Sequence, residues 1–140
     1  MCMTKKETKK QKQEQAFLML PSVDFCFQEL MEDMEVLRGF CGAILRVPPE
    51  EIEEIELLPK QLRKKHKEEK YGILDVHIRL NNGERMNIEM QSTSYDYWQE
   101  SSLFYLSKMY VEQIKQGEDY DSLKKCIHVG ILNFNLFRHD

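Results

Sequence analysis

The sequence predicts an α/β domain, in which a small mixed sheet is flanked by helices. Residues 23–45 and 97–116 carry apolar side chains at three- and four-residue intervals, as amphipathic helices do. Residues 72–91 contain two runs of alternating apolar and polar side chains, as the strands of a hairpin do. A short apolar run at 126–134 follows the second helix. A strand–helix–strand connection lets this last strand lie parallel to its neighbour, which makes the sheet mixed.

Length and composition indicate one folded domain. The chain has 140 residues, and we expect the domain to occupy residues 17–140 after a flexible polar tail at 1–16. The apolar fraction of 41% suffices for a core. The net charge of −4 excludes a general polyanion binder, so contact with nucleic acid would need a local basic patch or a bridging metal. Basic segments at 5–12 and 60–70 fit such a patch and a solvated tail or loop equally well.

Cysteines, histidines and apolar runs exclude several other classes of protein. The four cysteines and four histidines are scattered, without a CxxC pair or a ligand cluster, which argues against zinc and against a disulfide framework. The apolar runs are too short to span a bilayer, and no apolar segment of a signal peptide follows the basic N-terminus. We therefore expect a cytoplasmic protein that has no membrane partner.

The first helix and the segment after it differ in how clearly the sequence defines them. The helix at 23–45 ends before a Pro-Pro pair, which cannot continue it. Residues 52–58 are ambiguous. Ile55 and Leu57 alternate with glutamates as in a short strand, but a turn of helix after the prolines fits nearly as well.

The second helix and the last strand have clearer limits. The helical spacing at 97–116 is followed by Gly117, which is expected to be the C-cap of this helix. A turn over 118–122 then leads to the run CIHVGILNF at 126–134, which has the continuous apolar character of a buried strand.

Side-chain parity selects the register of the hairpin. The strands ILDVHIRL and ERMNIEMQ flank the turn sequence Asn81-Asn82-Gly83. A two-residue turn would place apolar side chains opposite polar ones at every step. A three-residue loop, with Gly83 in the left-handed conformation, keeps apolar opposite apolar and places Asp75 opposite Glu89.

This register predicts a cation site. Carboxylates directly opposite on antiparallel strands have Cβ atoms about 5 Å apart and repel each other. Mg²⁺ would offset the repulsion at Asp75 and Glu89, because it accepts one or two carboxylates and leaves its other positions to water and phosphate. Gln91 lies on the same face, diagonal to Asp75, and could orient a water or contact a phosphate. Periodicity alone favours the alternative of a solvated sheet face, on which Arg79 and Arg85 relieve the charge.

Longer strings resemble a known family. YGILDVHIRLNNGERMNIEMQ, followed by SLFYLSKMYVEQIKQGEDYDSLKKCIHVGILNFNLF, is similar to the PD-(D/E)XK nuclease family transposases, also called recombination-promoting nucleases. The likeness spans residues 22–137 and is specific over 71–137. It implies a restriction-endonuclease-like αβββαβ core and Mg²⁺-dependent cleavage of DNA, with Mn²⁺ as a substitute metal. The family's Asp and Glu correspond to Asp75 and Glu89, and Gln91 stands where the general motif has Lys.

Other residues are weighed against the same pattern. Gln91 is uncharged, so Lys108 on the second helix is the candidate for the positive group that the transition state needs; its alternative role is a solvated helix lysine. His77 is on the site face by parity and is expected to be a surface histidine, whereas His128 is expected to be buried and structural. Relatives usually continue past the last strand, so with the chain ending at Asp140 we expect a domain shortened at its C-terminus.

The sequence thus predicts a Mg²⁺-dependent DNA endonuclease of a recombination-promoting, mobile-element type. Asp75 and Glu89 would bind the metal, and Gln91 and Lys108 would complete the catalytic set. The alternative is a catalytically inactive remnant that binds DNA or a protein, which the missing motif lysine favours. The oligomeric state is left open, and a homodimer is one arrangement compatible with the sequence.

Overall fold

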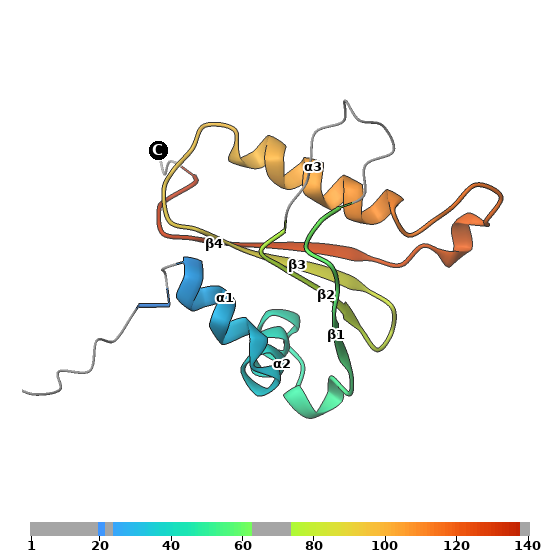
Figure 1. The fold of residues 1–140 in the computed structure, drawn as a ribbon, viewed down its shortest axis with the longest axis horizontal. Helices are drawn as coiled ribbons and strands as arrows, with labels where there is room; N and C mark the ends of the chain where they lie inside the picture. The colour runs from blue at the N-terminus through green and yellow to red at the C-terminus, as the bar shows by residue number, and fades with distance from the viewer. Residues whose placement is uncertain (1–19, 22–23, 63–73, 138–140) are drawn as a thin grey trace, which may run out of the picture.

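The computed structural model describes residues 20–21, 24–62 and 74–137. The predicted tail at 1–16 and most of the basic segment at 60–70 lie outside these residues. Within them, a four-stranded sheet carries helices α1 and α2 on one face and α3 on the other (Figure 1). This arrangement confirms the predicted α/β class and the order αβββαβ. No helix of the described chain is long and apolar enough to cross a membrane.

The first predicted helix is in fact two helices, α1 (Asp24–Glu32) and α2 (Met34–Leu45). Asp33 separates them because its backbone is extended (φ −74°, ψ 117°). Its carboxylate accepts hydrogen bonds of 2.9 and 3.1 Å from the backbone N–H groups two and three residues later, and so caps α2. The apolar spacing continues across this break, so the prediction of a single helix over 23–45 was wrong.

The sheet has the order β1-β2-β3-β4. Its strands are β1 (Ile55–Leu57), β2 (Val76–Leu80), β3 (Arg85–Gln91) and β4 (Cys126–Leu132). The ambiguous segment at 52–58 therefore contains a short strand. The first three strands are antiparallel neighbours, and β4 runs parallel to β3, as the crossover through α3 requires.

The hairpin has the predicted register. Val76 pairs with Ile88, and the backbone N–H of Leu80 donates to the carbonyl oxygen of Glu84 at 2.9 Å, which closes a three-residue loop. Gly83 has a φ of +84°, the left-handed conformation that this loop needs.

Replacing Gly83 by alanine is expected to lower the free energy of unfolding by about 1–2 kcal/mol, because an L-residue pays this much to adopt left-handed backbone. An added Cβ would also lie 3.2 Å from Cγ of Lys124, which must then shift. Urea unfolding monitored by circular dichroism measures the loss. Gly83→Asn is the control, because asparagine tolerates this conformation, and it should keep most of the stability. Full stability of Gly83→Ala would contradict the assigned loop.

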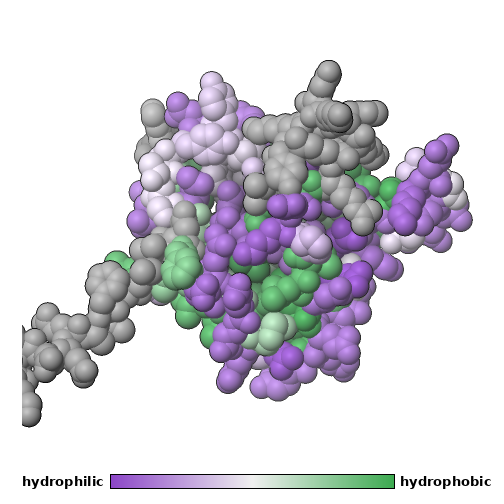
Figure 2. All heavy atoms as spheres, viewed as in Figure 1, coloured by the Kyte–Doolittle hydropathy of each residue, from purple (hydrophilic) through white to green (hydrophobic). Residues whose placement is uncertain are grey.

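Both faces of the sheet are covered. On one face the apolar side chains of the hairpin, such as Ile78 and Ile88, pack with Phe27 of α1 and Leu37 of α2 into the main core. Figure 2, which looks across the layers as Figure 1 does, shows apolar residues at the surface between α1 and β1, bordered by hydrophilic ones. The other face is covered by α3 (Trp98–Val111) and is not the solvated face that periodicity alone favoured.

Two element limits differ from the predictions. α3 ends at Val111, and Gly117 (φ +89°) is not its C-cap but part of a later turn, in which the N–H of Glu118 donates to the carbonyl oxygen of Lys115. β4 was predicted to be a buried strand, but every residue in it is half-buried, because β4 is the last strand of the described sheet and has a neighbour on one side.

Candidate active site

The structure places Asp75 and Glu89 side by side. Asp75 directly precedes β2, and the register that pairs Val76 with Ile88 puts it opposite Glu89, at the end of the hairpin away from the loop. Oδ2 of Asp75 accepts a hydrogen bond of 3.1 Å from the backbone N–H of Met90. This bond ties the carboxylate of Asp75 to β3 and holds it next to Glu89.

Glu89 is half-buried, and its charge is not fully compensated. Its side chain is 19% exposed, and Oε2 has no hydrogen-bond partner among the described residues. Burial first, and the negative charge of Asp75 second, raise the pKa of Glu89 to about 7. A buried carboxylate beside a second carboxylate is unfavourable as an anion unless something positive approaches it. The pair therefore has the electrostatic character of a cation site.

The donor atoms fit a hard divalent cation. Mg²⁺ prefers oxygen ligands, keeps several waters and is commonly held by one or two carboxylates, and Mn²⁺ accepts the same ligand types. The described part of the chain has no group of three or more His, Cys, Asp or Glu residues that could hold a metal. A cation at Asp75 and Glu89 would thus depend on water and substrate oxygens for its other ligands, which suits Mg²⁺ and does not suit a closed structural zinc site.

His128 on β4 also belongs to this site. The parallel register pairs His128 with Asn87, and their side chains meet on the face of β3 that carries Glu89. Nε2 of His128 lies 3.6 Å from Oε2 of Glu89, and Nδ1 lies 3.0 Å from Nδ2 of Asn87. Although the residue as a whole is half-buried, its imidazole is only 6% exposed, and this burial lowers the pKa below the ordinary 6.5, so that the neutral form prevails at pH 7. The sequence indicated its burial but not its position beside Glu89.

Helix α3 forms the wall of the site. Trp98, its first residue, packs on Gly130 so closely that a Cβ there would lie 2.2 Å from Cζ2 of the indole. Gly130 is the β4 partner of Glu89, and the indole ring centroid is 6.0 Å from that of His128. Tyr105 on the same helix lies within electrostatic reach of the carboxylates: burial first, and the charge of Glu89 second, raise its pKa.

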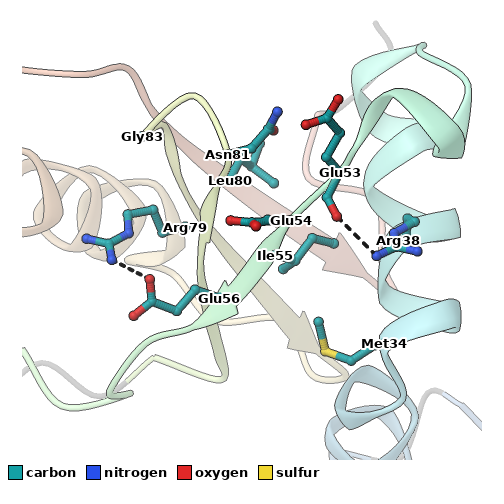
Figure 3. A pocket seen from close by; sticks show the side chains of 10 residues that line it. All are labelled: Met34, Arg38, Glu53, Glu54, Ile55, Glu56, Arg79, Leu80, Asn81 and Gly83. Atoms are coloured by element: carbon teal, nitrogen blue, oxygen red, sulfur yellow. Dashed lines mark hydrogen bonds and ion pairs between the residues drawn. The ribbon is translucent and has the colours of Figure 1, made fainter.

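A large pocket of the described chain lies elsewhere, between α2 and β1, with a volume of roughly 740 Å³ (Figure 3). Three glutamates line it, including Glu53 and Glu56, against two arginines. Arg79 pairs with Glu56, and Arg38 donates to the carbonyl oxygen of Glu53 at 3.4 Å. The acidic excess disfavours a phosphate ligand, and Arg79 is bound on β1 instead of relieving the charge at Glu89.

A family model described as PD-(D/E)XK nuclease family transposase matches residues 21–140. The chain belongs to this family. Searches of curated proteins and of solved structures gave no match. The match confirms the resemblance carried by 71–137 and supports a function of nuclease or transposase type.

In this member of the PD-(D/E)XK nuclease family transposases, the other predicted site residues have varied surroundings. Gln91 ends β3, and its Nε2 donates to the carbonyl oxygen of Thr93 at 2.7 Å. Lys108 is half-buried on α3, with Nζ 5.7 Å from the ring centroid of Phe104. His77 is 4% exposed, with Nδ1 3.0 Å from a backbone carbonyl oxygen. The prediction of a surface histidine at His77 was therefore wrong, because Pro59 and the segment that follows α3, including Glu112, lie against this side chain.

Proposed function

We propose that this protein is a metal-dependent DNA endonuclease, in which Asp75 and Glu89 hold Mg²⁺ or Mn²⁺. The observation that carries the proposal is the meeting of two carboxylates in one largely buried place, where the N–H of Met90 holds Asp75 and where burial and the charge of Asp75 raise the pKa of Glu89. Such a pair of carboxylates lowers the stability of the fold, and residues with strongly shifted pKa values concentrate at functional sites. Membership of the nuclease family supports DNA as the substrate.

The residues around the cation have separate roles. A cation bound there would polarise a phosphodiester and lower the pKa of a water. Asp75 is oriented by the N–H of Met90, so its carboxylate is preorganised on β3. Gln91 would orient a water or a phosphate from the end of β3. Lys108 would supply the positive charge that the lysine of the general motif supplies; it is half-buried on α3, one turn after Tyr105.

Nicking of supercoiled plasmid tests this function. Wild-type protein should convert the plasmid to the open-circular form in Mg²⁺ or Mn²⁺ and leave it intact in EDTA. Asp75→Asn keeps the shape of the side chain and removes its charge. Its initial rate should fall by at least about a hundredfold, more than the loss of an outer hydrogen-bond partner of a metal ligand costs.

The controls separate the outcomes. Glu54→Gln changes an exposed carboxylate in the pocket between α2 and β1 and should nick at the wild-type rate. Equal nicking by all three proteins would reveal a contaminating nuclease and remove the support for the proposal. Absence of metal-dependent nicking by the wild type, with DNA still bound, would favour a non-cleaving binding module.

A further inference from the structure

One buried polar pair beside the two carboxylates has no part in the proposed cleavage. Nε2 of His128 and Oε2 of Glu89 face each other at 3.6 Å, and both atoms are buried without a hydrogen-bond partner among the described residues. Two such atoms in one buried place are unfavourable unless they can satisfy each other. The separation is slightly longer than a hydrogen bond, and a small rotation of the carboxylate would close it.

The side chain of Asn87 determines which nitrogen of His128 carries the proton. Nδ2 of Asn87 lies 3.0 Å from Nδ1 of His128, and an amide nitrogen can only donate. Nδ1 therefore accepts, and a neutral imidazole carries its proton on Nε2, the atom that faces Glu89. The reversed amide would give the opposite tautomer and direct the lone pair of Nε2 at a carboxylate oxygen, which is repulsive.

We propose that His128 is a positioning residue that donates a hydrogen bond from Nε2–H to Oε2 of the metal ligand Glu89; this inference rests on the proposed function. One carboxylate oxygen of Glu89 is then held by His128, while the other is directed to the cation. The series of side-chain contacts from Asn87 to His128 to Glu89 runs from β3 to β4 and back to β3. Trp98, whose ring centroid is 6.0 Å from that of His128, packs beside these three side chains.

Calorimetric titration of the full-length metal-free protein with Mn²⁺ alone tests the proposal. His128→Phe should bind Mn²⁺ about 10–100-fold more weakly, the usual effect of removing the partner of a metal ligand. His128→Gln should recover most of the affinity, because its amide can donate to Glu89. His77→Phe is the matched control: His77 is also a buried histidine on this sheet face, but it contacts the carbonyl oxygen of Pro59 and should leave the affinity unchanged.

A second measurement needs no variant. Long-range ¹H–¹⁵N spectra of the wild-type histidines report the tautomer of each ring, and the His128 ring should carry its proton on Nε2. A proton on Nδ1 would overturn the proposal. So would wild-type affinity in His128→Phe, or equal weakening in His77→Phe, which would indicate a general disturbance of the sheet.

The titration also distinguishes this inference from the function on which it rests. If the wild type binds Mn²⁺ and Asp75→Asn does not, the cation site stands, and an unchanged His128→Phe would then overturn the role of His128 alone. If the wild type binds no Mn²⁺, the proposed function and this inference are both overturned.

Discussion

Glu89→Gln is expected to make the metal-free protein more stable at pH 8 while sharply reducing the proposed cleavage of DNA. The pKa of Glu89 rises from an ordinary 4.5 to about 7, so the folded state binds this proton more tightly than the unfolded state. Above pH 7 the carboxylate is charged in both states, and folding must bury it. By linkage, the shift corresponds to about 3 kcal/mol of lost stability, which a neutral glutamine avoids.

The pH dependence follows from the direction of this shift. Below pH 4.5 Glu89 is protonated in both the folded and the unfolded state, so folding buries no charge there. As the pH rises from 4.5 to about 7, the unfolded state releases this proton first, and the free energy of unfolding falls. Urea unfolding in EDTA at pH 5 and pH 8 should show a much larger gain for Glu89→Gln at pH 8. The exposed Glu54→Gln should show no such difference. A Glu89→Gln protein less stable than wild type at pH 8 would contradict the assigned burial.

Cleavage should change in the opposite direction. Glutamine has nearly the shape of glutamate but no charge to bind a cation, so the initial rate of plasmid nicking should fall by at least about a hundredfold at saturating Mg²⁺. Gained stability together with lost activity is what separates a functional carboxylate from a structural one, because a structural group cannot be removed with a gain in stability.

The hairpin half of the site could be predicted from the sequence because two local signals agreed. Alternating side chains divided the strands into an apolar and a polar face, and the Asn81-Asn82-Gly83 turn selected the three-residue loop. Together they fixed the pairing of Val76 with Ile88, and with it the meeting of Asp75 and Glu89. Register within a hairpin is a local property, so one sequence suffices to read it.

The β4 half could not be predicted in this way. Parallel strands are joined by a long crossover, and no turn sequence fixes their register. The contact of His128 with Glu89 depends on the pairing of His128 with Asn87, which follows from how α3 packs across the sheet. His77, whose place in an alternating strand suggested solvent, is likewise buried by segments distant in the sequence, Pro59 and the residues after α3. The Asp33 break was hidden for a different reason, since the apolar spacing continues through it.

Gly130→Ala is expected to lower the stability of the protein substantially. A Cβ at this position would lie 2.2 Å from Cζ2 and 2.7 Å from Cη2 of Trp98, both on a rigid ring, so the indole or the whole of α3 must move. Overpacking of this kind costs typically about 1–3 kcal/mol, and more where backbone must shift. Thermal unfolding should show a fall in Tm of roughly 5–10 °C for a domain of this size.

Gly39→Ala serves as the matched control, because Gly39 is exposed within α2 and an added Cβ would meet nothing within 4 Å. It should raise stability by about 0.5–1 kcal/mol, the helix preference of alanine over glycine. In the double variant Gly130→Ala/Trp98→Leu, the smaller side chain removes the clash, so the two changes should be less destabilising together than the sum of the single effects. Additive losses would show that the contact between Trp98 and Gly130 is not the cause.

Gly130→Ala should also reduce cleavage beyond its effect on folding. Gly130 pairs with Glu89, and the displaced indole of Trp98 is a neighbour of His128, so both the proposed metal ligand and its proposed positioning residue are disturbed. At a temperature where the variant is fully folded, its nicking rate should therefore remain below that of wild type. The absence of a side chain at Gly130 is what lets Trp98 of α3 pack closely on β4 at the residue paired with Glu89, and burial is the main cause of the raised pKa of Glu89.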